Sequence, residues 1–229
     1  MARVCAVRRH YMGRALIGRR CSSTSLSDWK WDDSRERGYF ADIREYTATR
    51  GVVVSPMNAM LSSRHGIPLP MIMCRSLEER FEREAPLPEI TPLNGRTTLM
   101  GLSFRESGRQ ALSTWIQPFM ATSPSRKQYV EVCAVEGRTH RFLLRYVLRS
   151  SLLAKLEPAE TSLVKAHLYS FVDLVDEFQA LGVRNRLAGY VFLIDSQGRI
   201  RWRASGKLEG PVCDMFTRFA NELDDEIAQ

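Results

Sequence analysis

The sequence lacks any long apolar stretch. Its longest uninterrupted apolar run extends only from Leu187 to Ile194, whereas a membrane-spanning helix needs about 20 such residues. The 229 residues are 44% hydrophobic and 26% charged, which is the composition of an ordinary globular chain. We therefore expect no transmembrane helix and one main folded domain with its own core.

The sequence also has few groups that could form disulfides or bind metal. Its five cysteines are Cys5, Cys21, Cys74, Cys133 and Cys213. None forms a CxxC motif, and the four histidines are isolated, so no zinc site or histidine-based triad is predicted. The segment Met71–Cys74 has soft ligands that suit Cu(I), but beside two prolines it is more simply a buried apolar stretch. We expect no metal, no cofactor and no small-molecule substrate.

Acidic residues are absent from the first 25 positions, which contain six arginines and end in a serine-rich segment. The rest of the chain has 27 basic and 26 acidic residues, so the overall net charge of +7 comes mostly from this end. On a helical wheel, Val4, Val7, Tyr11 and Ala15 lie on one stripe with arginines around it, as in a mitochondrial transit peptide. Residues 1–25 are therefore predicted to direct import. The alternative is a basic arm that touches RNA or lipid, but the nearly neutral body does not favour nucleic-acid binding.

Residues 26–95 mix charged helical stretches with stretches broken by proline. Prolines are frequent from Leu69 to Leu93, and they stop helices or leave extended chain. We expect helices around Ser34–Arg50 and Ser76–Glu84, joined by loops. This part is predicted to be a helical and irregular N-terminal extension.

From residue 96 onward the apolar periodicity alternates between that of strands and that of helices. The predicted strands are Thr97–Phe104, Tyr129–Val135, Gly189–Asp195 and Arg199–Ala204. The predicted helices are Gln110–Met120, Phe142–Leu156, Val172–Leu181 and one that begins at Pro211, while Leu163–Phe171 fits either a strand or a helix end. Gly182 suits a left-handed helix cap and Gly198 a hairpin loop with a bulge. The order of elements predicts an α/β fold for residues 96–229, with a thioredoxin-like mixed sheet flanked by helices.

The strand after Gly198 alternates apolar and basic residues. Ile200, Trp202 and Ala204 are predicted to share one face, which leaves three arginines for the other face. These arginines are Arg199, Arg201 and Arg203. They form either a solvated face or a positive strip that could meet an acidic partner or anionic lipid head groups.

Four sequence features near the C-terminus resemble one family signature. They are Asn185, the strand Gly189–Asp195, the segment Gly198–Trp202 and Gly206. Together they are similar to the signature of the mitochondrial ATPase complex subunit ten family. Weaker similarity lies in Tyr39–Arg50 and from Leu87 to Thr97, while Gly51–Ser76 shows no obvious match.

The resemblance implies an assembly factor rather than an enzyme. A member of this family is expected in the mitochondrial matrix, peripheral to the inner membrane, where it binds newly made ATP synthase subunit a and helps it join the ring of subunit c. The candidate partner-binding residues are Asn185, Tyr190, Arg199, Arg201, Trp202 and Arg203. Tyr190 and Trp202 also have a simpler interpretation as core residues. The Phe142–Leu153 helix is a further candidate, because it could shield apolar surface of a client.

The same region lacks the parts of a thiol enzyme. A redox thioredoxin carries its nucleophilic cysteine at the turn after the first strand, near a helix N-terminus. Here that turn is Phe104–Gly108, and Leu187–Gly189 stands where such folds usually place a cis-proline. Two other functions stay open. One is a peroxiredoxin-like or copper-delivery protein that uses Cys74, Cys133 or Cys213, and the other is a mitochondrial ribosome assembly factor.

Overall fold

The computed structural model describes residues 38–76, 84–93, 95–121, 125–135, 166–171 and 174–228, all within the compact unit Glu36–Gln229. The helices are α1 (Tyr39–Thr49), α2 (Leu87–Ile90), α3 (Glu106–Met120), α6 (Leu174–Phe178), the 3-10 helix η3 (Gln179–Leu181) and α7 (Pro211–Ala228). The strands are β1 (Ile67–Pro68), β2 (Met73–Ser76), β3 (Ala85–Pro86), β4 (Thr97–Ser103), β5 (Lys127–Ala134), β6 (Ala166–Ser170), β7 (Gly189–Ile194) and β8 (Arg199–Ser205). The predicted transit peptide at 1–25, the predicted helix at 142–156 and most of the helix predicted at 76–84 lie outside the described residues.

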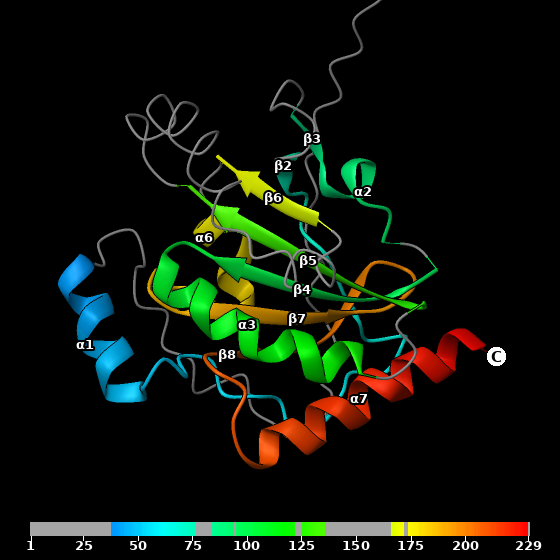
Figure 1. Ribbon diagram of the computed structural model, residues 1–229. Helices are drawn as coiled ribbons and strands as arrows, with labels where there is room; N and C mark the ends of the chain where they lie inside the picture. Colours follow the sequence, from blue (N-terminus) through cyan, green and yellow to red (C-terminus); the bar gives the residue numbers. More distant parts are fainter. Residues whose placement is uncertain are drawn as a thin grey trace, which may run out of the picture. The chain divides into compact units, whose positions relative to one another are not determined.

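A mixed sheet organises the described chain, with strand order β1-β8-β7-β4-β5-β6-β2-β3 (Figure 1). The central strand β4 is parallel to β5 and antiparallel to β7, and β5 is parallel to β6. Helix α3 joins β4 to β5 and makes the predicted βαβ unit. With the β7–β8 hairpin and the closing helix α7, this topology confirms the predicted thioredoxin-like class of α/β fold.

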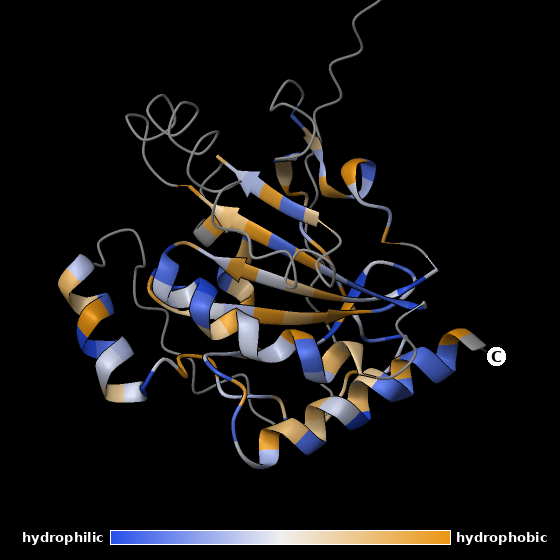
Figure 2. Ribbon diagram, viewed as in Figure 1, coloured by the Kyte–Doolittle hydropathy of each residue, from blue (hydrophilic) through white to orange (hydrophobic). Residues whose placement is uncertain are grey.

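Each face of the sheet has its own hydrophobic cluster. Helices α3 and α7 cover one face, where Trp115, Trp202 and Phe216 pack together, and α6 lies on the other face, where Phe178 meets Phe192 (Figure 1). The strands that both clusters share are apolar over most of their length, as the colouring of β7 in Figure 2 shows. Strands buried on both faces read as continuous apolar runs, which is why the sequence predicted them well.

The proline-rich part of the N-terminal extension enters the sheet. Strand β1 pairs with β8, and β2 pairs with β6 and β3. Pro68 and Pro86 lie in the two outermost strands, where a missing N–H donor is tolerated. Residue 95 therefore does not separate two compact units, because strands on both sides of it pair in one sheet.

The β7–β8 hairpin departs from simple alternation. Its turn contains Gly198 at φ 74°, as predicted. Leu193 pairs with Trp202, but Ile194 pairs with Ile200, so Arg201 is the extra residue of a β-bulge. Ile200 and Trp202 consequently belong to different hydrophobic clusters. The prediction that they share one face is wrong, because one extra residue reverses the facing of every side chain beyond it.

The structure also shows which elements form between residues 163 and 182. The ambiguous segment Leu163–Phe171 contains strand β6. The helix predicted at Val172–Leu181 appears as α6 followed by η3, and Gly182 ends it at φ 80° in the predicted left-handed conformation.

Gly108 of α3 is expected to resist substitution. A Cβ at this position would lie 2.7 Å from the carbonyl oxygen of Ala188 and 3.0 Å from the backbone nitrogen of Gly189. Alanine favours a helix by about 1 kcal/mol over glycine, so helix propensity alone predicts that Gly108→Ala stabilises the protein. We expect the backbone clash to dominate and to lower the free energy of unfolding by about 2 kcal/mol.

Urea unfolding measures this effect. Ser113→Ala, at an exposed position of the same helix, is the matched control and should change the stability by less than about 0.5 kcal/mol. An equal or higher stability of Gly108→Ala would contradict the tight contact between α3 and the start of β7.

Candidate functional site

The Tyr190 hydroxyl orders the loop that precedes β7. It accepts a hydrogen bond from the N–H of Asn185 at 2.8 Å and from that of Arg184 at 3.3 Å, and it donates to the carbonyl oxygen of Asn185 at 2.9 Å. Burial raises the pKa of Tyr190 to about 12, although the two N–H donors act in the opposite direction. Tyr190 is therefore a neutral, interior anchor of the loop.

Asn185 connects this loop to helix α1. Its Nδ2 donates to the carbonyl oxygen of Asp42 and to Oε2 of Glu45, both at 2.9 Å. Its Oδ1 accepts the N–H of Leu187 at 2.9 Å. Because the side chain is fully buried, each of these bonds satisfies a group that has little access to water.

The two flanking arginines complete the attachment of α1. The Arg184 guanidinium lies 2.6 Å from Glu45, and the Arg186 N–H donates to Asp42 at 3.2 Å. The Arg186 side chain also lies 3.8 Å from the Asp42 carboxylate. We call these five residues, Asp42, Glu45 and Arg184 to Arg186, the α1 clamp. Asp42 is the only fully buried residue of α1, so polar contacts provide the central part of this attachment.

Trp202 belongs to the core rather than to the surface. Its ring centroid lies 5.9 Å from that of Trp115 and 5.7 Å from that of Phe216. Its Nε1 donates to the carbonyl oxygen of Met57 at 2.8 Å. The indole thus fills space between the sheet and α7, with its one polar atom satisfied.

Arg201 is a buried cation with two carboxylate partners. Its guanidinium bonds Glu226 at 2.9 and 3.0 Å and Asp195 at 3.3 Å, and its Nε donates to the carbonyl oxygen of Leu61. Burial by itself lowers the pKa of Arg201, but Glu226 and Asp195 outweigh it and raise the pKa. Arg201 therefore fixes the C-terminal part of α7 to the β7–β8 hairpin.

The predicted positive strip on β8 does not exist. Arg201 is only 1% exposed and is neutralised by acidic residues. Arg199 is half-buried and lies 3.6 Å from Asp195. Arg203 lies beside Gly182 and donates to the carbonyl oxygen of Ala180 at 3.5 Å, and burial lowers its pKa. The prediction is wrong because the bulge and the buried carboxylates separate the three cations.

Of the six predicted partner-binding residues, four have fully buried side chains, so these four offer no surface to a partner. They are Asn185, Tyr190, Arg201 and Trp202. Partner contact through the half-buried Arg199 and Arg203 stays a prediction.

The turn where a thioredoxin carries its cysteine contacts the backbone of the loop before β7. Ser107 Oγ donates to the carbonyl oxygen of Leu187 at 2.8 Å, and Gly108 packs on the backbone of Ala188 and Gly189. The described residues contain no cis peptide bond. This turn therefore serves to join α3 to the loop that holds α1.

The three described cysteines are free, and only Cys74 is fully buried. Burial raises the pKa of Cys74 to about 12, with a further contribution from Glu84, and burial also raises the pKa of Cys133 to about 12, with Glu131 adding to it. Cys213 is half-buried. Within the described ranges, no group of three His, Cys, Asp or Glu side chains could hold a metal ion. In the segment 71–74, Ile72 and Cys74 are buried, as expected for an apolar stretch, while Met71 is exposed.

The acidic half of the α1 clamp was not predicted from the sequence. Asp42 and Glu45 are three residues apart on α1, so they point in similar directions from the helix. The weak similarity of Tyr39–Arg50 to the family was the available signal, but it did not identify their partners more than 130 residues away. Nothing in the local pattern distinguishes these acids from solvent-exposed ones.

Comparisons with known proteins give one family and a group of similar folds. The family model described as ATP10 protein matches residues 30–223. No curated protein matches the sequence. Among the described residues, no helix has both the length and the apolar character needed to cross a membrane.

Among the solved structures that match are thiol-disulfide proteins with low sequence identity. A secreted thiol-disulfide isomerase from Corynebacterium glutamicum is 11% identical, with 71% of this chain and 91% of that chain covered and a TM-score of 0.45. A thiol:disulfide interchange protein from Bacteroides sp. is 14% identical, with 68% and 90% covered and a TM-score of 0.43.

Removing the Asn185 amide is expected to release α1. In Asn185→Ala the carbonyl oxygen of Asp42, a Glu45 oxygen and the N–H of Leu187 lose their buried partner, which should cost about 2 kcal/mol. Relative to the parent protein, the rate of hydrogen exchange should then increase more in Tyr39–Thr49 than in β4 or β7. Thr47→Ala, at an exposed position of the same helix, is the control. Unchanged exchange in α1 of Asn185→Ala would show that other contacts hold the helix.

The buried thiol of Cys74 is expected to be inert in the folded protein. In a chain with Cys5 and Cys21 replaced by serine, a disulfide reagent at pH 8 should modify the half-buried Cys213 first. It should modify Cys133 more slowly, because the pKa of this half-buried thiol is raised, and it should reach Cys74 only after unfolding. Because folding raises both pKa values from 9.0 to about 12, the unfolded chain releases these protons first. Their contribution to stability should therefore fall as the pH rises from about 9 to about 12. Rapid modification of Cys74 in the folded state would contradict this account.

Proposed function

Because this chain belongs to the ATP10 protein family, a family of ATP synthase assembly factors, we propose that it is a non-catalytic assembly factor for the membrane sector of that enzyme. Its client is newly made subunit a, and its action favours the association of subunit a with the ring of subunit c. The observation that carries this proposal is the family match over residues 30–223, which includes α1, the sheet and most of α7.

The interior of the protein supports a non-catalytic role. The signature residues Asn185, Tyr190 and Trp202 are used for internal packing and hydrogen bonding. The turn at Phe104–Gly108 has no cysteine, and burial keeps the thiols of Cys74 and Cys133 protonated at neutral pH. A thiol or thiolate mechanism needs an accessible nucleophile, so these features favour a scaffold that binds another polypeptide.

The proposed location follows from the basic N-terminal segment and from the family. Residues 1–25 direct the chain into the mitochondrial matrix, where it lies peripheral to the inner membrane. Binding to the client depends on complementary shape and charge rather than on a cofactor. The nearly neutral charge of the chain after residue 25 argues against a nucleic-acid partner.

Affinity purification from crosslinked mitochondria tests this proposal. The tagged full-length chain should recover subunit a together with other synthase subunits, and its removal should reduce the amount of assembled membrane sector. Recovery of ribosomal RNA and ribosomal proteins without synthase subunits would instead identify a ribosome assembly factor. The control is a tagged matrix protein of similar size.

A cysteine variant separates the assembly role from thiol or copper chemistry. The chain with Cys74, Cys133 and Cys213 replaced by serine should restore synthase assembly in cells that lack the protein, to at least about half of the normal level. Cys74 is part of a hydrophobic cluster, so circular dichroism must first show that the variant folds. A folded variant that fails to restore assembly would contradict the non-catalytic role.

A further inference from the structure

Helix α1 presents faces of opposite charge. Its two acidic residues, Asp42 and Glu45, face the body of the protein in the α1 clamp. With 3.6 residues per turn, Phe40 and Arg44 lie on the opposite side of the helix. Arg44 is exposed and donates to the carbonyl oxygen of Phe40, at 3.4 Å. The side of α1 that faces away from the clamp is therefore cationic and carries no acidic residue.

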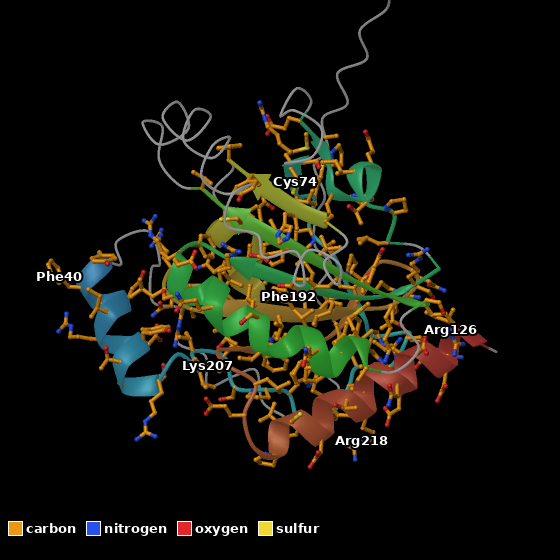
Figure 3. The ribbon with its side chains drawn as sticks, in the orientation of Figure 1. Phe40, Cys74, Arg126, Phe192, Lys207 and Arg218 are labelled. Carbon is orange, nitrogen blue, oxygen red and sulfur yellow. The ribbon has the colours of Figure 1, made fainter. Side chains whose placement is uncertain are left out.

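Two aromatic side chains extend this outer side at the start of the helix. Phe40 is 76% exposed and Tyr39 is 56% exposed, and their rings meet edge-on with centroids 6.2 Å apart. Figure 3 shows Phe40 on the outer side of α1, away from the sheet. Aromatic residues and arginine are the types most enriched where proteins contact each other.

Arg50 is a second exposed cation, at the other end of the helix. The helix ends with two backbone hydrogen bonds, one from the N–H of Arg50 to the carbonyl oxygen of Thr47 and one from the N–H of Gly51 to that of Tyr46. In helix ends of this kind, the residue in the left-handed conformation is usually glycine. Arg50 takes that position at φ 52°, and it is the one described residue other than glycine with a positive φ. An arginine is thus held in a strained backbone conformation, although a glycine would fit better.

Lys207 adds a further cation near this helix end. Gly206 packs so closely on the segment after α1 that a side chain there would lie 2.9 Å from the carbonyl oxygen of Gly51 and 3.2 Å from Val52. Lys207 follows directly and is exposed (Figure 3). None of Arg44, Arg50 and Lys207 forms an ion pair within the described part of the chain.

We propose that the outer face of α1, formed by Tyr39, Phe40, Arg44 and Arg50, docks an acidic segment of the protein client that carries an apolar residue beside its carboxylates. The α1 clamp neutralises the acids of the helix internally, so the outer face keeps only positive charge. This inference rests on the proposed function, because it takes the client to be subunit a.

The strained conformation of Arg50 favours a protein carboxylate over a lipid surface. Attraction to anionic lipid needs only positive charge near the surface, which lysine or arginine on any relaxed backbone supplies. A guanidinium that binds a carboxylate through two parallel hydrogen bonds must be placed accurately. We therefore expect a strained backbone at an arginine that must bind one carboxylate in a defined geometry.

Photocrosslinking at two equally exposed positions tests the proposed face. The full-length chain carries p-benzoylphenylalanine at position 40 or, as the matched control, at position 71. Phe40 is 76% exposed and Met71 is 74% exposed, and Met71 lies just before β2, away from α1 in the sequence. After import into mitochondria that synthesise labelled subunit a, we expect the crosslink from position 40 and not from position 71.

The other outcomes of this experiment overturn the proposal in distinguishable ways. Subunit a that co-purifies without a crosslink from position 40, or with one from position 71 only, removes the α1 face and leaves the proposed function standing. Lipid adducts alone at position 40 identify a membrane contact and also remove it. Absence of subunit a from the purified material removes the proposed function together with the face.

Substitutions at Arg50 separate binding from folding. Arg50→Gly and Arg50→Asn suit the left-handed conformation, so their melting temperatures should be equal to or higher than that of the parent. The crosslink of subunit a from position 40 should nevertheless decrease about tenfold. Arg64→Gly, at an exposed position in the loop before β1, should leave the yield unchanged. An unchanged yield in both Arg50 variants would overturn the role of Arg50.

Discussion

The buried amide of Asn185 is the interaction on which the arrangement of the N-terminal helix depends. It binds two acceptors on α1 and one donor in its own loop, all at 2.9 Å. A buried amide with every partner in place stabilises the fold, whereas a partly satisfied one is costly. This one side chain therefore commits the loop, the helix and the start of β7 to a single arrangement. Tyr190 supports it by fixing the backbone of Asn185.

A second constraint connects this loop to the turn where related folds perform chemistry. The contact between Gly108 and the Ala188–Gly189 backbone leaves no room for a side chain on α3 at that point. Ser107 adds a hydrogen bond to the carbonyl oxygen of Leu187. The turn Phe104–Gly108 contains no cysteine, and its last two residues contact the loop before β7. The same part of the fold thus serves to hold α1.

The sequence was most informative where one local rule decides the structure. The strand Gly189–Ile194 was predictable because a continuous apolar run reports burial on both faces, and Gly182 and Gly198 were predictable because their turns require positive φ. The orientation of β8 was not, because its residues alternate in the printed order while the bulge at Arg201 changes their facing. At the bulge, Arg201 contacts Glu226 and Leu61, which are distant in the sequence.

The candidate site illustrates the same limit for charge. Local sequence shows that Asp42, Glu45 and Arg50 are charged. It does not show that the two acids bind Arg184 to Arg186 while Arg50 stays exposed on the surface. Asp42 and Glu45 are paired with the arginines of the clamp at short distance, where Coulomb attraction is strongest. They therefore do not offset the positive charge on the other side of the helix. A helix that is nearly neutral by composition thereby presents a cationic side to its surroundings.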